Sequence, residues 1–278
     1  MKRQLTILLL AVIGGVTITA QSFVPYHPFI KEGKTWNCQE KGRISETINN
    51  VYALFDQTTQ YSLRICGDTI IDNKTYKKVY LEKEVVDKEL VQTIPIEAMQ
   101  NMERSVHLEK NSTTLYPEFL REENKMVYAR RANTNQEFVL YDFSVAEGEK
   151  VSSMFPLGEV VVNHISTIVV QEQIFRCFHL SANSGYEPLW VEGIGHPGGP
   201  FHSANAKVND GKIYTLLSCY EDNTCIFTAD DFKIASSVSS AKVDVLQTSS
   251  KVFDLQGRLT GKPTKGVYIQ NGEKRVVR

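Results

Sequence analysis

The chain has 278 residues, 42% of them hydrophobic, and its 31 basic and 32 acidic side chains leave a formal net charge of −1. This near-neutral balance excludes the strongly basic surface that nucleic-acid-binding proteins use, so we expect no nucleic-acid partner. A chain of this length can bury about 70–75% of its unfolded surface, so it needs neither a metal nor a dense disulfide framework to fold. We expect no cofactor.

The first twenty residues have the pattern of a secretory signal peptide. Lys2 and Arg3 precede the apolar run "LTILLLAVIGGV", and small or polar residues follow as far as Ala20. We predict cleavage between Ala20 and Gln21. The apolar run is shorter than the roughly 20 residues that a membrane helix needs, and no later run approaches that length, so we expect no membrane span.

All five cysteines follow the signal peptide, and an exported chain meets an oxidising compartment in which disulfides persist. Cys219 and Cys225 flank the polar stretch "YEDNT", so a hairpin would bring them face to face, and we predict a disulfide there. Cys38 with Cys66 is a second possible pair, because connectivity cannot be read from spacing alone. Cys177 is then left over and is interpreted as a small buried hydrophobic residue.

Residues 21–233 are expected to form one antiparallel β domain. Short runs rich in β-branched and aromatic residues, such as residues 137–145, 159–170 and 174–182, have strand length. Two-residue turn signals separate many of the runs. They are Asp72-Asn73, Glu123-Asn124, Asp210-Gly211, and, towards the C-terminus, Gln256-Gly257 and Asn271-Gly272. This pattern predicts a meander sandwich or an irregular barrel, with one or two helical turns only within residues 94–110.

The composition changes near the C-terminus. Residues 234–250 are serine-rich and are expected to be a linker, and residues 251–278 are expected to form a small β-hairpin module. A turn at Asn271-Gly272 would pair Gln270 with Glu273, Ile269 with Lys274, Tyr268 with Arg275 and Val267 with Val276. Two such hairpins cannot build a stable core alone, so a partner or the main domain would have to support them.

The stretch "WVEGIGHPGGPFH" is the first candidate site, with Trp190, Glu192, His196 and His202 set among glycines and prolines. In a functional interpretation the two histidines bind a metal, or Glu192 and His196 act as an acid/base pair. In a structural one the glycines make a tight connection, Trp190 packs in the core, and the histidines are solvated loop residues. Metal sites need three or four ligands and no third is evident, so the structural interpretation is preferred.

Cys177 and His179 are a second candidate, because they lie two residues apart and so share one face of a strand. Side chains at that spacing stand side by side rather than converge, which disfavours a nucleophilic pair. Residues 82–89 ("EKEVVDKE") are expected to be a solvated face. The sequence has no G-x-S-x-G, H-E-x-x-H, P-loop or dinucleotide motif, so enzymes that carry those motifs are disfavoured.

The C-terminal residues carry a resemblance. "VFDLQGRL" (residues 252–259), "GVYI" (266–269) and the terminal "KRVVR" (274–278) resemble the C-terminal sorting domain of type IX secretion. The motif positions are Val252, Leu255, Gly257, Gly266, Tyr268, Lys274, Val276, Val277 and Arg278. The resemblance implies recognition by an outer-membrane secretion translocon, and hence a secreted or cell-surface protein. A Pro-Asn-Pro-like start is missing and residues 260–265 are shorter than usual, as in a vestigial signal on a periplasmic protein.

The body resembles uncharacterised secreted β-proteins over most of residues 60–230, a group that brings no established activity. We therefore expect a non-enzymatic exported protein that binds a glycan or a protein. The alternative is a secreted hydrolase whose site is assembled from dispersed residues such as His164, His196 and an aspartate. A histidine within about 3.2 Å of a carboxylate or thiol in a concave pocket would favour the hydrolase.

Overall fold

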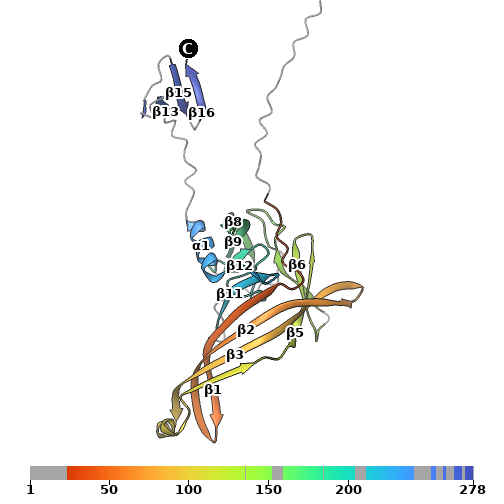
Figure 1. Ribbon diagram of the computed structural model, residues 1–278, viewed down its shortest axis with the longest axis vertical. Coiled ribbons are helices and arrows are strands. Elements are labelled where there is room, and N and C mark those ends of the chain that lie inside the picture. The colour runs from red at the N-terminus through yellow and green to blue at the C-terminus, as the bar shows by residue number, and fades with distance from the viewer. Residues whose placement is uncertain are drawn as a thin grey trace, which may run out of the picture.

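The computed structural model describes residues 24–134, 136–151, 159–183, 185–203 and 211–240, and the strands between residues 252 and 277. Antiparallel strands dominate these residues (Figure 1), so the predicted all-β class is confirmed. We call the part of the chain that precedes the C-terminal strands the body. It has two open sheets, and aromatic rings from both meet between them. Of the two predicted architectures, the sandwich is the one observed.

The larger sheet has nine strands. Their order is β12 (Thr224–Thr228), β11 (Ile213–Glu221), β1 (Thr35–Ile48), β2 (Val51–Ile71), β3 (Lys74–Ile94), β5 (Thr114–Glu123), β6 (Met126–Arg131) and β7 (Glu137–Asp142), while β4 (Ser105–Lys110) also pairs with β3. The smaller sheet has the order β10 (Leu189–Val191), β9 (Gln173–Ala182), β8 (Val160–Val170). Successive strands along the chain are mostly neighbours, as the meander prediction requires.

Tight turns with positive φ at both central residues join several hairpins. At the predicted turn Asp72-Asn73 the φ angles are 50° and 59°, the conformation that matches the twist of the flanking strands. The second predicted turn is wrong by one residue: Glu123 pairs with Met126, so Asn124 and Lys125 make the turn. Asp210 lies outside the described residues, so the turn predicted at Asp210-Gly211 is not tested.

One large core lies between the sheets. Trp36 on β1 and Trp190 on β10 are both fully buried, with Tyr141 and Phe143 between the layers. The Tyr141 and Trp190 rings meet edge to face, with centroids 5.1 Å apart, a favoured aromatic geometry. Inward and outward residues alternate along β1, so the period-two pattern of the sequence corresponds to this buried face.

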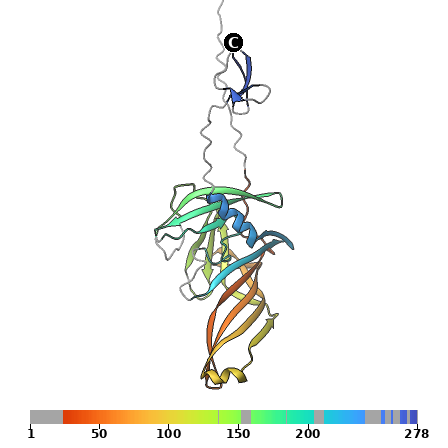
Figure 2. The ribbon, with the colours of Figure 1, turned by 90° about the vertical axis from the view of Figure 1, so that its left-hand side faces the viewer.

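Part of the larger sheet extends beyond the second layer. β11 pairs with β1 only as far as Lys41, and beyond that point β1 to β4 continue without a covering sheet (Figure 2). We call residues 42–59 and 84–110 the finger. It has its own small core, built on Ala53, Phe55 and Leu90, and a 3₁₀ helix, η1 (Ile96–Asn101), at its end. Exposed apolar side chains gather near this end, including Ile48, Tyr52, Ile94 and Ile96.

The one or two helical turns predicted within residues 94–110 are observed, and a strand occupies the rest of that stretch. Its first part forms η1, and Ser105–Lys110 is strand β4, because all six of these residues pair with β3. The stretch 82–89 lies in β3, and its acidic residues include Glu82, 2.8 Å from Arg64, and Asp87, 2.6 Å from His107. These carboxylates are ion-paired on a strand, in keeping with the predicted solvated face.

The serine-rich segment is not a linker over its first part. Ile234 to Ser240 belong to α1 (Ala229–Ser240), which buries Phe232 and Ala235 against the body. The Asp231 carboxylate accepts hydrogen bonds from the Thr228 backbone N–H (2.8 Å) and hydroxyl (2.7 Å), an arrangement typical of a helix start. α1 is therefore part of the body, and no described helix has the length and apolar character to cross a membrane.

The predicted disulfide between Cys219 and Cys225 does not form, and all five cysteines are free. The turn at Asp222-Asn223 pairs Glu221 with Thr224 and Tyr220 with Cys225, so Cys225 does not face Cys219. A bulge between Cys219 and Tyr220 then places Cys219 opposite Phe227. Cys219 points into the core, as does Cys38, which is not bonded to Cys66. Cys177 is fully buried, as predicted.

The C-terminal strands form a separate antiparallel sheet in the order β14 (Leu259–Thr260), β13 (Val252–Asp254), β15 (Gly266–Gln270), β16 (Glu273–Val277). The four predicted pairings between β15 and β16 are all confirmed, from Val267 with Val276 to Gln270 with Glu273. Six of the nine motif positions lie in these strands. Leu255, Gly257, Arg278, the turns at Gln256-Gly257 and Asn271-Gly272, and the signal peptide with its cleavage site at Ala20 and Gln21 lie outside the described residues.

Candidate functional site

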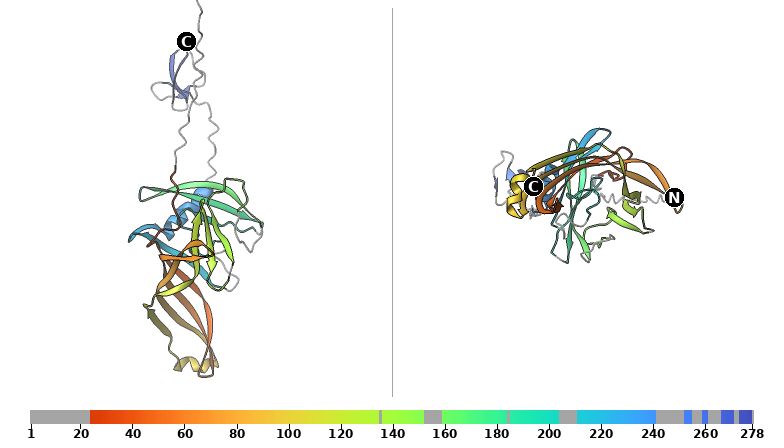
Figure 3. Two further views of the ribbon diagram at one scale, coloured as in Figure 1. Left: turned by 90° about the vertical axis from the view of Figure 1, so that its right-hand side faces the viewer. Right: turned by 90° about the horizontal axis from the view of Figure 1, so that it is seen from below.

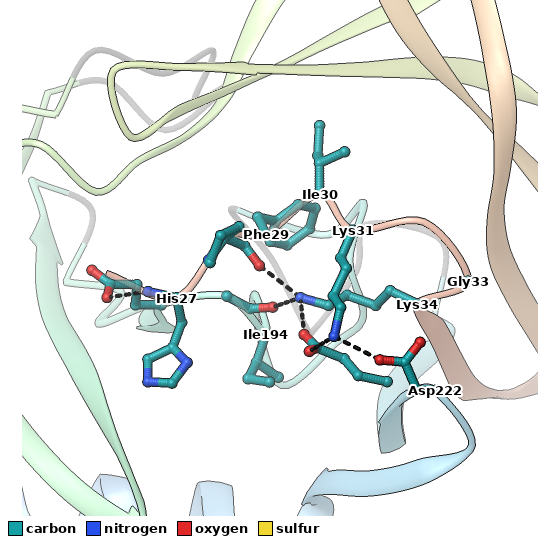
Figure 4. Close-up of polar contacts among 12 residues, drawn as sticks. His27, Phe29, Ile30, Lys31, Gly33, Lys34, Ile194 and Asp222 are labelled. Atoms are coloured by element: carbon teal, nitrogen blue, oxygen red, sulfur yellow. Dashed lines mark hydrogen bonds and ion pairs between the residues drawn. The ribbon is translucent and has the colours of Figure 1, made fainter. Parts of the chain in front are cut away.

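The first candidate site, the loop after Trp190, holds an N-terminal strap, residues 24–34 (Figure 4). Glu192 is fully buried, accepts the His27 backbone N–H at 3.0 Å and pairs with Arg176. From the other side, the buried Lys34 ammonium donates to the backbone oxygen of Gly193 at 2.9 Å. The same ammonium lies 2.8 Å from Glu221 Oε1, so the strap is held to the body by two carboxylates, Glu192 at His27 and Glu221 at Lys34.

The glycines of this loop are required by the strap. At Gly193, φ is +77° and an added Cβ would lie 2.8 Å from the Cβ of His27. At Gly195, φ is +110° and an added Cβ would lie 2.9 Å from the Tyr141 hydroxyl and 3.2 Å from the Phe29 ring. Both conformations and both close approaches exclude a side chain, so the glycine-rich sequence serves packing.

The histidines of the loop do not form the metal site or the acid/base pair of the functional interpretation, which the sequence had disfavoured. His196 is buried, accepts the Gly198 N–H at Nδ1 (2.9 Å) and has Nε2 3.3 Å from the Tyr186 hydroxyl. Burial, with a smaller effect of His202, lowers the pKa of His196 to about 3, so the imidazole is neutral. Glu192 bonds to His27 and Arg176, and so does not form the acid/base pair with His196 that the functional interpretation required.

The structural interpretation of this loop is therefore correct for Trp190, which is a core residue whose indole N–H donates to the Ser203 oxygen at 2.6 Å. It is wrong for His196, which was expected to be solvated but is buried. His202 is partly exposed and stacks on Tyr214, with ring centroids 4.0 Å apart. Within the described parts of the chain, no three His, Cys, Asp or Glu side chains are grouped to hold a metal ion.

A second site, which we call the histidine cleft, lies beside α1 on the smaller sheet. His164 on β8 stands directly opposite His179 on β9, and their rings stack with centroids 5.8 Å apart. The cleft encloses about 410 Å³. Its walls are formed by Asn163, His164, His179, Glu187, Leu189 and Ser236.

Polar contacts extend from both histidines. His164 Nδ1 lies 2.9 Å from Glu147 Oε1, and His179 Nε2 lies 2.8 Å from Ser166 Oγ. Burial lowers the pKa of His179, and the neighbouring His164 lowers it further, so His179 is neutral near pH 7. A neutral imidazole can accept a proton from a hydroxyl, as a general base must. The criterion set for the hydrolase alternative is thus met at His164.

The disfavoured pairing of Cys177 with His179 as a nucleophilic couple is not observed. Both side chains lie on one face of β9, but His179 bonds to Ser166. Burial raises the pKa of the Cys177 thiol to about 12, so it is a thiol and not the thiolate that a nucleophile requires. Ser166 and Glu147 were not identified from the sequence, because each contacts a histidine from another segment of the chain. Ser166 contacts His179 on β9, and Glu147 contacts His164, which follows a bulge in β8.

Comparison with protein-family models, curated proteins and solved structures finds no match to this chain. The site is therefore interpreted from its own geometry.

Proposed function

We propose that this chain is an exported β-protein that binds a macromolecular ligand without transforming it, and that its C-terminal strands direct its export to the cell surface or medium. Support for export comes from the basic and apolar residues of the first twenty positions and from the resemblance of residues 252–278 to a type IX sorting domain. The β15–β16 register is the one that this tail was expected to have. A periplasmic location is the outcome if the tail is vestigial.

The observation that favours binding over catalysis is the burial of the candidate nucleophiles. Ser166 is 6% exposed and Cys177 is fully buried with a raised pKa, so a substrate would not reach either group without rearrangement. By contrast, the finger and the outer face of the nine-stranded sheet present large surfaces on a rigid scaffold. Such surfaces are where binding functions of β-proteins reside.

Two measurements test this proposal. Cells expressing the full chain, or a chain lacking residues 252–278, are fractionated and probed with antibodies to the body. We expect surface or medium localisation only for the full chain, and unchanged localisation after deletion would contradict a sorting role. The mature chain is then screened against immobilised glycans and surface proteins, and absence of any saturable ligand would contradict the binding role.

A hydrolase is the second candidate, because Ser166 Oγ lies 2.8 Å from the neutral His179. A fluorophosphonate probe tests it, since the probe labels only serines activated by a base. Labelling of the native chain that disappears in Ser166→Ala, but persists in the surface control Ser45→Ala, would establish the hydrolase and overturn the binding proposal. We expect no labelling.

A further inference from the structure

The outer face of the nine-stranded sheet carries a row of uncharged hydrogen-bonding side chains that crosses three strands. Ser218 on β11, Asn37 on β1 and Ser62 on β2 are direct cross-strand neighbours. Asn37 Nδ2 donates to Ser218 Oγ at 3.1 Å, and Ser62 Oγ donates to Asn37 Oδ1 at 2.7 Å. These bonds fix the orientation of the amide, and they leave its second N–H and the oxygen lone pairs for a ligand.

The rows on either side continue the same chemistry. Gln39 stands opposite Gln60, and neither side-chain amide forms a hydrogen bond with another described residue. On the other side, Thr35 and Arg64 are flanked by Tyr220 on β11 and Tyr80 on β3. Because strand residues alternate between faces, all three rows lie on the side of the sheet opposite to Trp36 and Cys38, which are buried.

This face is hollowed rather than flat. Two adjoining depressions share Asn37 and enclose about 270 and 340 Å³. The first is lined by Gln60, Ser62, Lys83 and Ser218, and the second by Thr35, Arg64, Glu82 and Tyr220. The sheet bends strongly in this region (Figure 3). We call the two depressions together the polar groove, and from β11 to β3 it spans three strand spacings, on the order of 14 Å.

We propose that the polar groove binds a neutral oligosaccharide, an inference that rests on the proposed binding function and names its ligand class. Each sugar hydroxyl both donates and accepts a hydrogen bond, as do the amides and hydroxyls of the three rows. Tyr220, which lines the second depression, offers an apolar ring face with a polar edge. The groove is longer than one sugar ring, which favours an oligomer.

Charge in the groove favours a neutral ligand. Arg64 Nε lies 2.8 Å from Glu82 Oε1, so this cation is balanced within the groove. A polyanion would meet the Glu82 carboxylate, and a polycation would meet Arg64 and the exposed Lys83. Recognition by uncharged groups predicts that affinity is nearly independent of salt concentration, whereas charge-driven binding weakens as salt screens it.

Isothermal titration of the mature chain tests the proposal. The probes are neutral hexasaccharides of β-1,4-glucose, β-1,3-glucose, xylose and mannose, with an oligogalacturonate as the acidic comparator. We expect saturable, salt-insensitive binding of at least one neutral probe, and at least a tenfold loss of affinity in Gln60→Ala and in Tyr220→Ala, because both side chains line the groove. The control is Arg43→Ala/Asp56→Ala, a cross-strand pair on the same face of β1 and β2 but outside the groove, and it should bind as the unmodified chain does.

Gln60 is exposed and does not pack in the core, so its replacement leaves the fold intact, and circular dichroism checks this for every variant. Absence of binding to all neutral probes overturns the inference, as does preferential, salt-sensitive binding of oligogalacturonate. Binding of a protein ligand that the groove variants leave unchanged also overturns it, while the proposed binding function stands. A chain that binds neither a glycan nor a protein overturns both.

Discussion

Replacing Gly193 with alanine should unfold the protein more readily by detaching the strap from its loop. Gly193 has φ +77°, and alanine in this left-handed region is strained by about 1–2 kcal/mol. In addition, the new Cβ would lie 2.8 Å from the His27 Cβ and 3.0 Å from its carbonyl oxygen, and overpacking of this kind costs about 1–3 kcal/mol. The sum, about 2–5 kcal/mol, is a large part of the roughly 5–15 kcal/mol that stabilises a typical domain.

Gly185 provides a matched control, because it has nearly the same φ, +78°, but nothing lies within 4 Å of an added Cβ. Gly185→Ala therefore has the backbone strain without the clash. Urea unfolding gives the free energy of unfolding of both variants, and the difference between them measures the clash with the strap. Limited proteolysis near His27 shows whether the strap has detached. Equal destabilisation of the two variants, with no new cleavage, would refute the role assigned to the loop.

Three further predictions concern protonation, the cysteines and the finger. The native pKa of His196 is about 3 against 6.5 for a free histidine, so as the pH falls the unfolded chain takes up this proton before the native chain does. The contribution of His196 to the free energy of unfolding is therefore complete above pH 6.5 and is lost progressively towards pH 3. At about 1.4 kcal/mol per pH unit, the free energy of unfolding falls by about 3 kcal/mol between pH 6.5 and pH 4.5. Urea unfolding should show a smaller pH dependence for His196→Gln, and an equal pH dependence would contradict the lowered pKa of His196. Iodoacetamide should alkylate Cys66 and Cys225 in the native protein, because both are partly exposed, and should reach the three buried cysteines only after unfolding. If Cys219 and Cys225 resist alkylation in protein that is unfolded but not reduced, a disulfide joins them. Phe55→Ala removes the largest side chain of the finger core, so hydrogen exchange should accelerate within the finger but not around Trp36; uniform acceleration would show that the two cores unfold together.

The sequence was informative where local chemistry decides the structure. Asn and Asp tolerate positive φ, so the turn at Asp72-Asn73 could be read directly, and the alternation around Asn271-Gly272 fixed the register of the last hairpin. Helix α1 was missed because serines are common in linkers. In the structure, however, Ser236 Oγ donates to the Phe232 carbonyl at 2.8 Å, a bond that accommodates serine within a helix.

The sites were harder to predict, because they depend on contacts between distant segments and on bulges. The turn at Asp222-Asn223 sets a register in which Cys225 faces Tyr220 and not Cys219, and a bulge before His164 brings that residue opposite His179. Bulges have no reliable signature in a single sequence. The glycine-rich loop attracted attention as a site because its packing partner, the strap, lies more than 150 residues earlier in the chain.

The strap also constrains the order in which the molecule is completed. Phe29 bonds through its backbone to Glu122, His27 to Glu192, and Lys31 to Glu221, which are 93, 165 and 190 residues further along. A segment that emerges early therefore finds its final neighbours only when β11 has been made, and contacts of such long sequence separation form slowly. Until β11 has been made, the apolar Phe29 ring and the acidic groups that later bind the strap lack these partners, so we expect the unfinished body to expose apolar surface that favours aggregation.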